Sequence, residues 1–464
     1  MADGGTLRSP NPSPATFPAC NISNASSRIV RKCSSSLRVS FSSSSQSPPN
    51  PRYAVLGAGF AGLSVAYHLL KQSPSDSHVR VDIYDEVGLG GGASGVSGGL
   101  IHPYSPKGCS GLIGRVLAAK LLWKGKECWT ECLELLRVAE EASALDELKN
   151  KSENTDGFRV RRRGILRPAL SMKNLDVLSE NARNCLPSCR IQSINQDASK
   201  NLIPNLSTPC DAAFYLPDAV NINPQRYIQA LYLACQNLVQ EAADLGQGEK
   251  ELQLHKSSIN KLIDLDSEYT AVIVCLGAKA DLLPELSGRL PLRTCRGVIA
   301  HMQLPEFAAN SDIGNSPSVL SDAWLAVQNS SSLYMGATWD WKSRNYSRDV
   351  SGEEASRALE ELLPKASVIY PCIKDWKFSG AMAGVRAMPP LTTNNGSLPL
   401  LGSIDEFVTG NGNHCAKFWL FGGLGSRGLL YHALLGKLTA NAVVSCNEHS
   451  IPCELTSWNK TNNA

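Results

Sequence analysis

The chain has 464 residues, a length that predicts a large hydrophobic core and more than one domain. Apolar residues make up 43% and charged residues 19% of the chain, and no apolar run reaches about 18 residues, which excludes a membrane-spanning helix. The net charge of +3 is too small to indicate a nucleic-acid partner from composition alone.

The first 50 residues differ in composition from the rest of the chain. They hold 14 serines and five arginines or lysines but a single acid, Asp3. This composition, without the apolar stretch of a secretory signal, predicts an organellar transit peptide, and the serine clusters favour a chloroplast over a mitochondrion. A tail without a targeting role is the alternative.

A dinucleotide-binding turn is predicted directly after this segment. Residues 53–56 form a short apolar run typical of a buried parallel strand, and residues 63–70 have helical spacing. Between them lies Gly57-x-Gly59-x-x-Gly62, whose glycines allow a tight turn, the close approach of a pyrophosphate, and helix–strand packing. The N-terminus of the helix would offer unpaired N–H groups to the phosphates.

A second strand and an acid complete this unit. Residues 79–84 are followed by Asp85 and Glu86, at the point where a βαβ unit of this kind holds the ribose hydroxyls. The motif itself serves both NAD and FAD. The glycine-dense stretch 90–106 follows Asp85 by a few residues, so we expect it to leave the sheet beside the cofactor and not to act as a linker.

The later segments predict a second sheet and further helices. The expected elements are helices over 112–148 and after Pro224, mixed polar structure over 171–205, strands over 252–259 and 270–276, antiparallel strands over 292–341, a helix over 352–364, and a strand at 418–421. Strand 270–276 ends in Gly277-Ala278, a small-residue turn suited to the ligand edge of a sheet. The glycine turn 422–428 feeds a closing helix, and a ligand held from both ends of the chain favours FAD.

These elements predict an α/β fold in which a Rossmann-like FAD-binding domain carries an inserted α+β substrate domain built on an antiparallel sheet. The expected segments are the transit peptide (1–50), the FAD-binding domain (51–110, 211–290 and 381–450), a helical and substrate-domain segment (111–210), the substrate sheet (291–380) and a tail (451–464).

Cysteines and arginines form two further patterns. The 15 cysteines are scattered through the chain and predict free thiols, and the pairs Cys128/Cys132 and Cys185/Cys189 lack the further ligands of a zinc site, so no metal is expected. Five arginines lie between Arg159 and Arg167, which indicates either a solvated strand or a phosphate-contacting surface.

The motifs resemble a known family. GAGFAGLSVAYHLL, GASGVSGGLIHP, VIVCLGA, GVRAMPP with LPLLG, and GGLGSRGLL occur in the order found in the D-amino-acid/glycine/sarcosine oxidase (DAO) family of FAD flavoproteins. The resemblance covers most of residues 51–445. Within the family, GASGVSGGLIHPYSP, GATWDW with LEELLP, and FGGLGSRGLL are most similar to the oxidase domain of MnmC, the bacterial tRNA wobble-uridine modification enzyme.

The resemblance implies non-covalent FAD, because no cysteine or histidine matches the family's covalent attachment point. It also implies a site: Arg386 as the anchor of the substrate carboxylate and Trp324 beside the substrate, where glycine oxidases have a tyrosine. Asn394 and Asn395 stand where the family commonly has an aspartate, and both departures suit a substrate bulkier than glycine. The implied cofactor contacts are Gly57, Ala58, Gly59, Phe60, Ala61, Gly62, Asp85, Glu86, Ala93, Ser94, Gly98, Gly99, Leu100, Ser258, Gly277, Ala278, Leu424, Gly425, Ser426, Arg427, Gly428 and Leu429.

The resemblance implies oxidation of a C–N bond, with a hydride passing to flavin N5 and oxygen as the final electron acceptor. The substrate would be a small amine or, if the similarity to MnmC extends to function, the carboxymethylaminomethyl group of a tRNA wobble uridine, with the cluster Arg159–Arg167 contacting phosphates. The alternatives are an oxidase of glycine, sarcosine or a D-amino acid, and a FAD-bearing assembly or RNA-binding protein without turnover. His102 and Tyr104 are expected to face either the substrate cavity or the core.

Overall fold

The computed structural model describes residues 50–74, 77–105, 121–150, 157–246, 248–305, 313–392, 396–409 and 415–459. The predicted transit peptide therefore lies outside the described residues up to residue 49, as do Asn394, Asn395 and part of the helical prediction at 112–148. In the described chain no helix combines the length and the apolarity that a membrane crossing requires.

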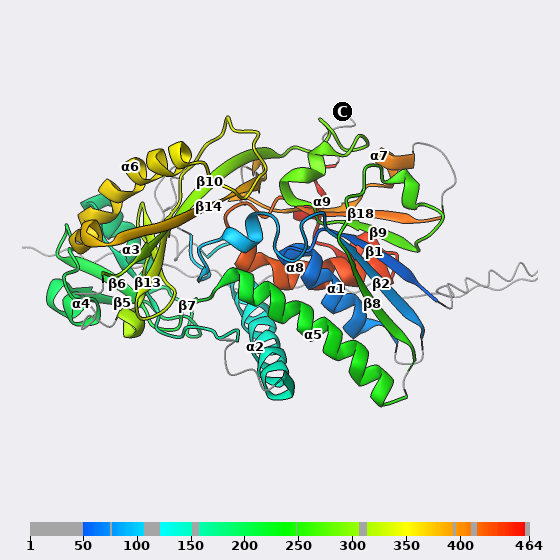
Figure 1. The fold of residues 1–464 in the computed structure, drawn as a ribbon, viewed down its shortest axis with the longest axis horizontal. Helices are drawn as coiled ribbons and strands as arrows, with labels where there is room; N and C mark the ends of the chain where they lie inside the picture. Colours follow the sequence, from blue (N-terminus) through cyan, green and yellow to red (C-terminus); the bar gives the residue numbers. More distant parts are fainter. Residues whose placement is uncertain are drawn as a thin grey trace, which may run out of the picture. The chain divides into compact units, whose positions relative to one another are not determined.

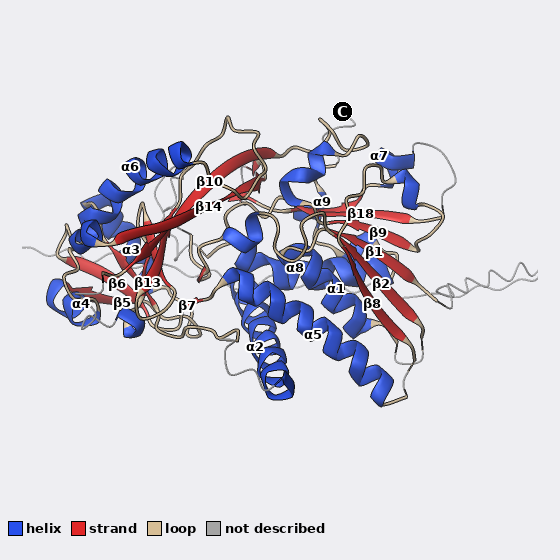
Figure 2. Cartoon of the chain, in the orientation of Figure 1, coloured by secondary structure: helices blue, strands red, loops and turns tan. Residues whose placement is uncertain are grey.

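One sheet has six strands in the order β17–β18–β9–β1–β2–β8 (Figures 1 and 2). All neighbours are parallel except β17 and β18, which are antiparallel. Its strands are β1 (Arg52–Leu56), β2 (Val79–Tyr84), β8 (Lys250–His255), β9 (Ala271–Val274), β17 (Leu400–Ser403) and β18 (Lys417–Gly422). Because β1 pairs with both β2 and β9, the glycine turn, Asp85 and Gly277 meet at the carboxyl edge of this sheet.

Four helices pack together on one side of this sheet (Figure 1). They are α1 (Phe60–Gln72), α2 (Gly125–Asn150), α5 (Pro224–Asp244) and α8 (Gly428–Val444). Helices α1, α5 and α8 contact the strands of the sheet, and α2 packs on α5 and α8. Side chains alternate along β1, so Tyr53 and Val55 pack with the helices while Ala54 and Leu56 join a second buried cluster on the other face. Burial on both faces explains the nearly unbroken apolar runs of these strands.

A second sheet has eight strands in the order β14–β10–β13–β12–β11–β4–β6–β5. Its strands are β4 (Ile165–Pro168), β5 (Gln192–Asn195), β6 (Ala212–Leu216), β10 (Arg293–Gln303), β11 (Ser318–Val319), β12 (Trp324–Val327), β13 (Ser332–Gly336) and β14 (Lys377–Met388). The pairing is antiparallel apart from β11 with β4, and α6 (Gly352–Ile369) packs on it through Leu362 and Ala366. The predicted α/β fold with two sheets is confirmed.

The remaining elements are short. They are α3 (Met172–Arg183), α4 (Gln196–Leu202), α7 (Asp405–Thr409), α9 (Cys453–Thr456), and two short antiparallel pairs, β3 (Leu100–Ile101) with β7 (Val220–Asn221) and β15 (Leu391–Thr392) with β16 (Gly396–Ser397). The twelve cysteines in the described ranges are free thiols, as expected.

Two strands do not follow the segment boundaries expected from the sequence. β6 lies in the eight-stranded sheet although residues 211–290 were assigned to FAD binding. β14 runs through residue 381 because it pairs with β10 along its whole length, and it ends before Pro389, whose missing N–H cannot extend the ladder. The strand expected at 252–259 is shifted and spans Lys250–His255.

Candidate functional site

A cavity of about 1230 Å³ lies at the carboxyl edge of the six-stranded sheet and extends to the eight-stranded sheet. Gly57 after β1, Asp85 after β2, Gly277 after β9 and Gly422 at the end of β18 line one part, and Arg386 of β14 lines another. Sites for a single small ligand usually measure about 300 to 1,000 Å³, so this cavity has room for a dinucleotide together with a substrate.

The glycine turn leaves no space for side chains. Gly57 has φ +109°, and a Cβ there would stand 2.6 Å from the carbonyl oxygen of Cys275. A Cβ at Gly62 would stand 1.8 Å from the carbonyl oxygen of Gly57, so α1 packs directly against the turn. The first turn of α1 faces the cavity through Phe60 and Ala61. The N–H of Phe60 donates to Ser94 Oγ at 3.2 Å, and the N-terminal end of the helix suits a pyrophosphate.

Asp85 has a structural role that the sequence did not reveal. One carboxylate oxygen accepts a hydrogen bond of 2.9 Å from the N–H of Ala58, and the other accepts from Val87 at 3.0 Å and Gly88 at 2.9 Å. The carboxylate thereby ties the glycine turn to the loop after β2. It retains lone pairs for a ribose hydroxyl because a carboxylate has about four acceptor sites. Glu86 forms an ion pair with Lys279 at the same rim.

Trp324 occupies a slot between two glycines. A Cβ at Gly98 would stand 2.8 Å from its indole ring, and a Cβ at Gly336 would stand 2.5 Å from it. The indole therefore packs directly on the loop 93–100 and forms part of the cavity wall. The sequence suggested that this loop is glycine-rich to approach the flavin. The structure gives a further reason for glycine at position 98, because the indole of Trp324 occupies the space that a side chain would need.

Arg386 presents a cation to the cavity. Its guanidinium lies between Gly297, where a Cβ would come 2.2 Å from Nη2, and the ring of Trp339, whose centroid is 4.4 Å from Cζ. Nη1 donates to the carbonyl oxygen of Thr338 at 3.3 Å and lies 4.0 Å from Cys295 Sγ. Among the described residues, no carboxylate pairs with Arg386. Burial lowers its pKa from 12.5, although the guanidinium keeps its charge.

His102 and Tyr104 have different surroundings. His102 lines the cavity, and its Nδ1 accepts a hydrogen bond of 3.2 Å from the N–H of Tyr104. Burial, followed by the positive charges of Arg427 and Arg167, holds the His102 pKa well below 6.5, so the ring is neutral. The Tyr104 hydroxyl is in the core, where it donates to the carbonyl of Cys189.

The structure brings nearly all the predicted site residues together. Every predicted cofactor residue lines the cavity except Ala58 and Gly62, which are buried behind it, and both Arg386 and Trp324 are in the wall. Among the lining residues that sequence reasoning missed are six on β10 or in the chain after β13: Arg293, Gly297, Trp339, Trp341, Tyr346 and Arg348. The alternation in Thr-Trp-Asp-Trp, which places two tryptophans on one side of an extended chain, was the signal available for two of them.

The arginine cluster of residues 159–167 is largely engaged within the protein. Arg159 and Arg162 pair with Glu147 and Glu140 of α2. Arg161 donates to the carbonyl oxygens of residues 314 and 316 at 2.7 and 2.9 Å. Nearby acids and carbonyl groups therefore already accept hydrogen bonds from these three side chains, and a contact between the cluster and phosphates stays a prediction.

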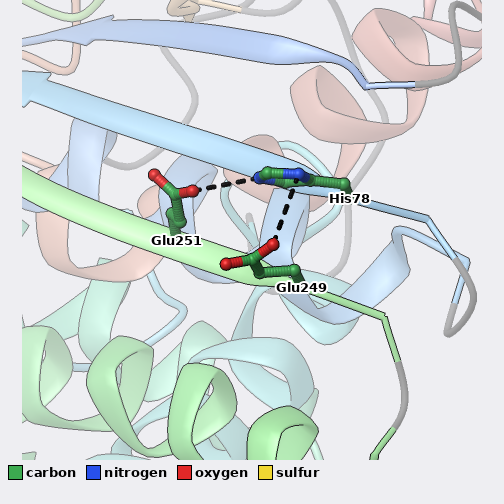
Figure 3. A group of neighbouring side chains, drawn as sticks. All are labelled: His78, Glu249 and Glu251. Atoms are coloured by element: carbon green, nitrogen blue, oxygen red, sulfur yellow. Dashed lines mark hydrogen bonds and ion pairs between the residues drawn. The ribbon is translucent and has the colours of Figure 1, made fainter.

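One group with metal-ligand spacing occurs among the described residues, and it lies away from the cavity (Figure 3). His78, just before β2, is 3.0 Å from Glu251 and 3.7 Å from Glu249 of the neighbouring chain segment. Arg80 also donates to Glu251 at 3.4 Å. Both carboxylates thus have partners within the protein, and the group sits at the amino ends of β2 and β8, opposite the glycine turn.

Comparisons with known proteins agree with this geometry. The model of the FAD-dependent oxidoreductase family matches residues 52–442. Similar solved structures include glycine oxidase from Geobacillus kaustophilus (18% identity, 86% of this chain and 96% of that chain, TM-score 0.60). Iminodiacetate oxidase from Chelativorans sp. BNC1 is 20% identical over 87% of this chain and 98% of that chain, with a TM-score of 0.60. L-Proline dehydrogenase from P. horikoshii is 15% identical over 90% of this chain and 99% of that chain, with a TM-score of 0.64. None of the curated protein sequences matches the chain.

Proposed function

Because the chain belongs to the family of FAD-dependent oxidoreductases, we propose that it oxidises a C–N bond in an amine that carries a carboxylate. Arg386 is the observation that carries this proposal. It is a half-buried cation in the cavity wall, with no carboxylate partner among the described residues. A planar guanidinium binds a carboxylate through two parallel hydrogen bonds, and a pure scaffold has no need of such an anchor.

The residues of the cavity fit FAD. The glycine turn, the first turn of α1 and Asp85 form a cradle for a pyrophosphate and a ribose, and the turn before α8 closes the cavity from the far end of the chain. FAD supplies the two-electron acceptor of the reaction: a hydride leaves the carbon next to nitrogen, a proton leaves the nitrogen, and water splits the resulting imine into an amine and an aldehyde acid. The protein contributes the position of the substrate.

The proposed substrate contains the unit N–CH₂–COO⁻. Two of the similar structures are named for glycine and iminodiacetate, which share this unit. We favour a larger second substituent on nitrogen, because the wide cavity leaves room for one. The carboxymethylaminomethyl group of a tRNA wobble uridine is one such substrate, and its oxidation would release glyoxylate. A free amino or imino acid, such as glycine, sarcosine or a D-amino acid, is the alternative.

The test of the anchor is Arg386→Lys. We expect the variant to retain FAD and to show a higher KM for sarcosine or iminodiacetate, measured as peroxide release if oxygen is the electron acceptor and by flavin bleaching under nitrogen if it is not. Arg163→Lys, at an exposed position of the same residue type, is the control. An unchanged KM in a FAD-loaded Arg386→Lys protein would refute the carboxylate role.

The tRNA substrate is tested separately. Nucleoside analysis of organellar tRNA from cells without this protein should show accumulation of the carboxymethylaminomethyl group. Unchanged tRNA together with rapid oxidation of a free amino acid would support the alternative. We also propose that residues 1–50 direct the protein to the chloroplast, which import assays with isolated chloroplasts and mitochondria can decide.

A further inference from the structure

Four side chains form a continuous series of pairwise contacts along one wall of the cavity. Cζ of Arg386 lies 4.4 Å from the ring centroid of Trp339. The rings of Trp339 and Trp341 are stacked, with centroids 6.0 Å apart and planes at 22°. Cζ of Arg293 lies 4.9 Å from the ring centroid of Trp341. The proposed carboxylate anchor is thus the inner end of a row of flat groups.

The backbone fixes the tryptophan pair in place. Residues 339–341 continue beyond β13 in extended form, and Asp340 exchanges two backbone hydrogen bonds of 2.8 Å with Arg296 of β10. Alternation along an extended chain places Trp339 and Trp341 on the same side. The Arg296 side chain, only 1% exposed, pairs with Glu354 at 2.7 Å and donates to the carbonyl oxygens of residues 345 and 349, which holds the following loop.

The two indoles remain unusually open. Trp339 is 48% exposed and Trp341 is 41% exposed, although both line the cavity. A centroid distance of 6.0 Å is that of an offset pair, so part of each ring face stays uncovered. Clustered exposed aromatic surface at the margin of a cavity marks a place where a ligand binds. Arg293 and Arg348 add two cationic side chains to the lining of the same cavity.

We propose that Trp339 and Trp341 form a platform that binds a planar ring carried by the substrate amine. This inference rests on the proposed function, because it takes Arg386 as the carboxylate anchor. The guanidinium and the nearer indole are in contact, so a compound with a few bonds between its carboxylate and its ring spans both. The substrate class is therefore an N-carboxymethyl amine whose other substituent bears an aryl group or a nucleobase. The flat face is recognised by stacking, which accepts any planar ring.

Binding of unreactive ethers tests the platform without turnover. Phenoxyacetate and methoxyacetate share the carboxylate and differ in the ring, and 5-carboxymethoxyuridine carries a nucleobase in its place. By calorimetry on the FAD-loaded protein, we expect the ring compounds to bind about 5- to 100-fold more tightly than methoxyacetate. Trp341→Ala should remove this preference, and Trp341→Phe should largely restore it. Tighter binding of phenoxyacetate would indicate an aryl group as the ring of the substrate, and tighter binding of 5-carboxymethoxyuridine would indicate a nucleobase.

The outcomes separate the platform from the anchor. Equal binding of phenoxyacetate, 5-carboxymethoxyuridine and methoxyacetate to the wild-type protein would overturn the platform and leave the anchor standing. A preference that persists in Trp341→Ala and in Trp339→Ala would also overturn it. If none of the three ethers binds, or if Arg386→Lys leaves binding unchanged, the proposed function itself fails. Melting temperatures of the variants show whether each protein is folded.

Discussion

Replacing Gly297 by alanine tests the placement of the anchor with a single methyl group. The new Cβ would stand 2.2 Å from Nη2 of Arg386 and 2.6 Å from Cζ and Nη1. These atoms are the far end of a flexible side chain, so the guanidinium moves and the strand does not. Alanine is about 0.5 to 1 kcal/mol more favourable than glycine within regular structure, and the fold should therefore keep its stability.

The expected loss appears in substrate binding. A hydrogen bond to a charged group contributes about 1.5 to 3 kcal/mol, which corresponds to about a 10- to 100-fold rise in KM for sarcosine or iminodiacetate. Steady-state kinetics on protein of known flavin content measures this rise. Gly352→Ala is the control, because a Cβ there meets nothing within 4 Å. A folded, flavin-loaded Gly297→Ala protein with an unchanged KM would show that the carboxylate binds elsewhere.

Three further changes probe the fold and the cofactor site. Gly62→Ala should abolish FAD binding, because its Cβ would stand 1.8 Å from the carbonyl oxygen of the glycine turn; the flavin absorbance per mole of protein measures this. His432 is fully buried with its pKa lowered by burial from 6.5 to about 4, so the unfolded chain takes up a proton that the native protein refuses. The contribution of His432 to the free energy of unfolding, fully present above about pH 6.5, should fall by about 3 kcal/mol as the pH drops to about 4, and urea titrations of His432→Gln should show a flatter pH dependence than wild type. Glu354→Ala leaves Arg296 buried without its carboxylate and should lower the free energy of unfolding by about 3 kcal/mol, whereas Glu353→Ala, at an exposed position, should have almost no effect; equal melting temperatures of the two variants would contradict this.

Local patterns in the sequence predicted the cofactor side of the molecule well. The strand at 53–56 is β1 with one residue added, and the helix expected after Pro224 begins at that residue, with Asn223 accepting a hydrogen bond from the N–H of Arg226 as its N-cap. The glycine turn was predictable because its function depends on backbone space at fixed spacing. Such constraints act within a few residues, so a single sequence displays them.

The substrate side depended on contacts that a single sequence does not display. Arg386 and Trp339 are brought together by the pairing of β14 with β10 and by the chain that follows β13, and nothing near either residue indicates the other. The arginine cluster was visible as charge, but its partners Glu140 and Glu147 lie on α2. Their separation of seven residues, two helical turns, places both acids on one face, which was the available signal.

The residues proposed to bind the substrate lie on two kinds of structure, a paired strand and a loop. Arg386 is carried by β14, which pairs with β10 without a register shift from Gly380 to Met388, whereas Trp339, Trp341, Tyr346 and Arg348 belong to the connection between β13 and α6. Under the proposed function, the carboxylate end of a substrate would be held by a strand of the sheet, and its ring would meet the segment between β13 and α6. A library of substitutions confined to residues 339–348, with Arg296 and Glu354 unchanged, should alter which amines are oxidised while the protein still binds FAD.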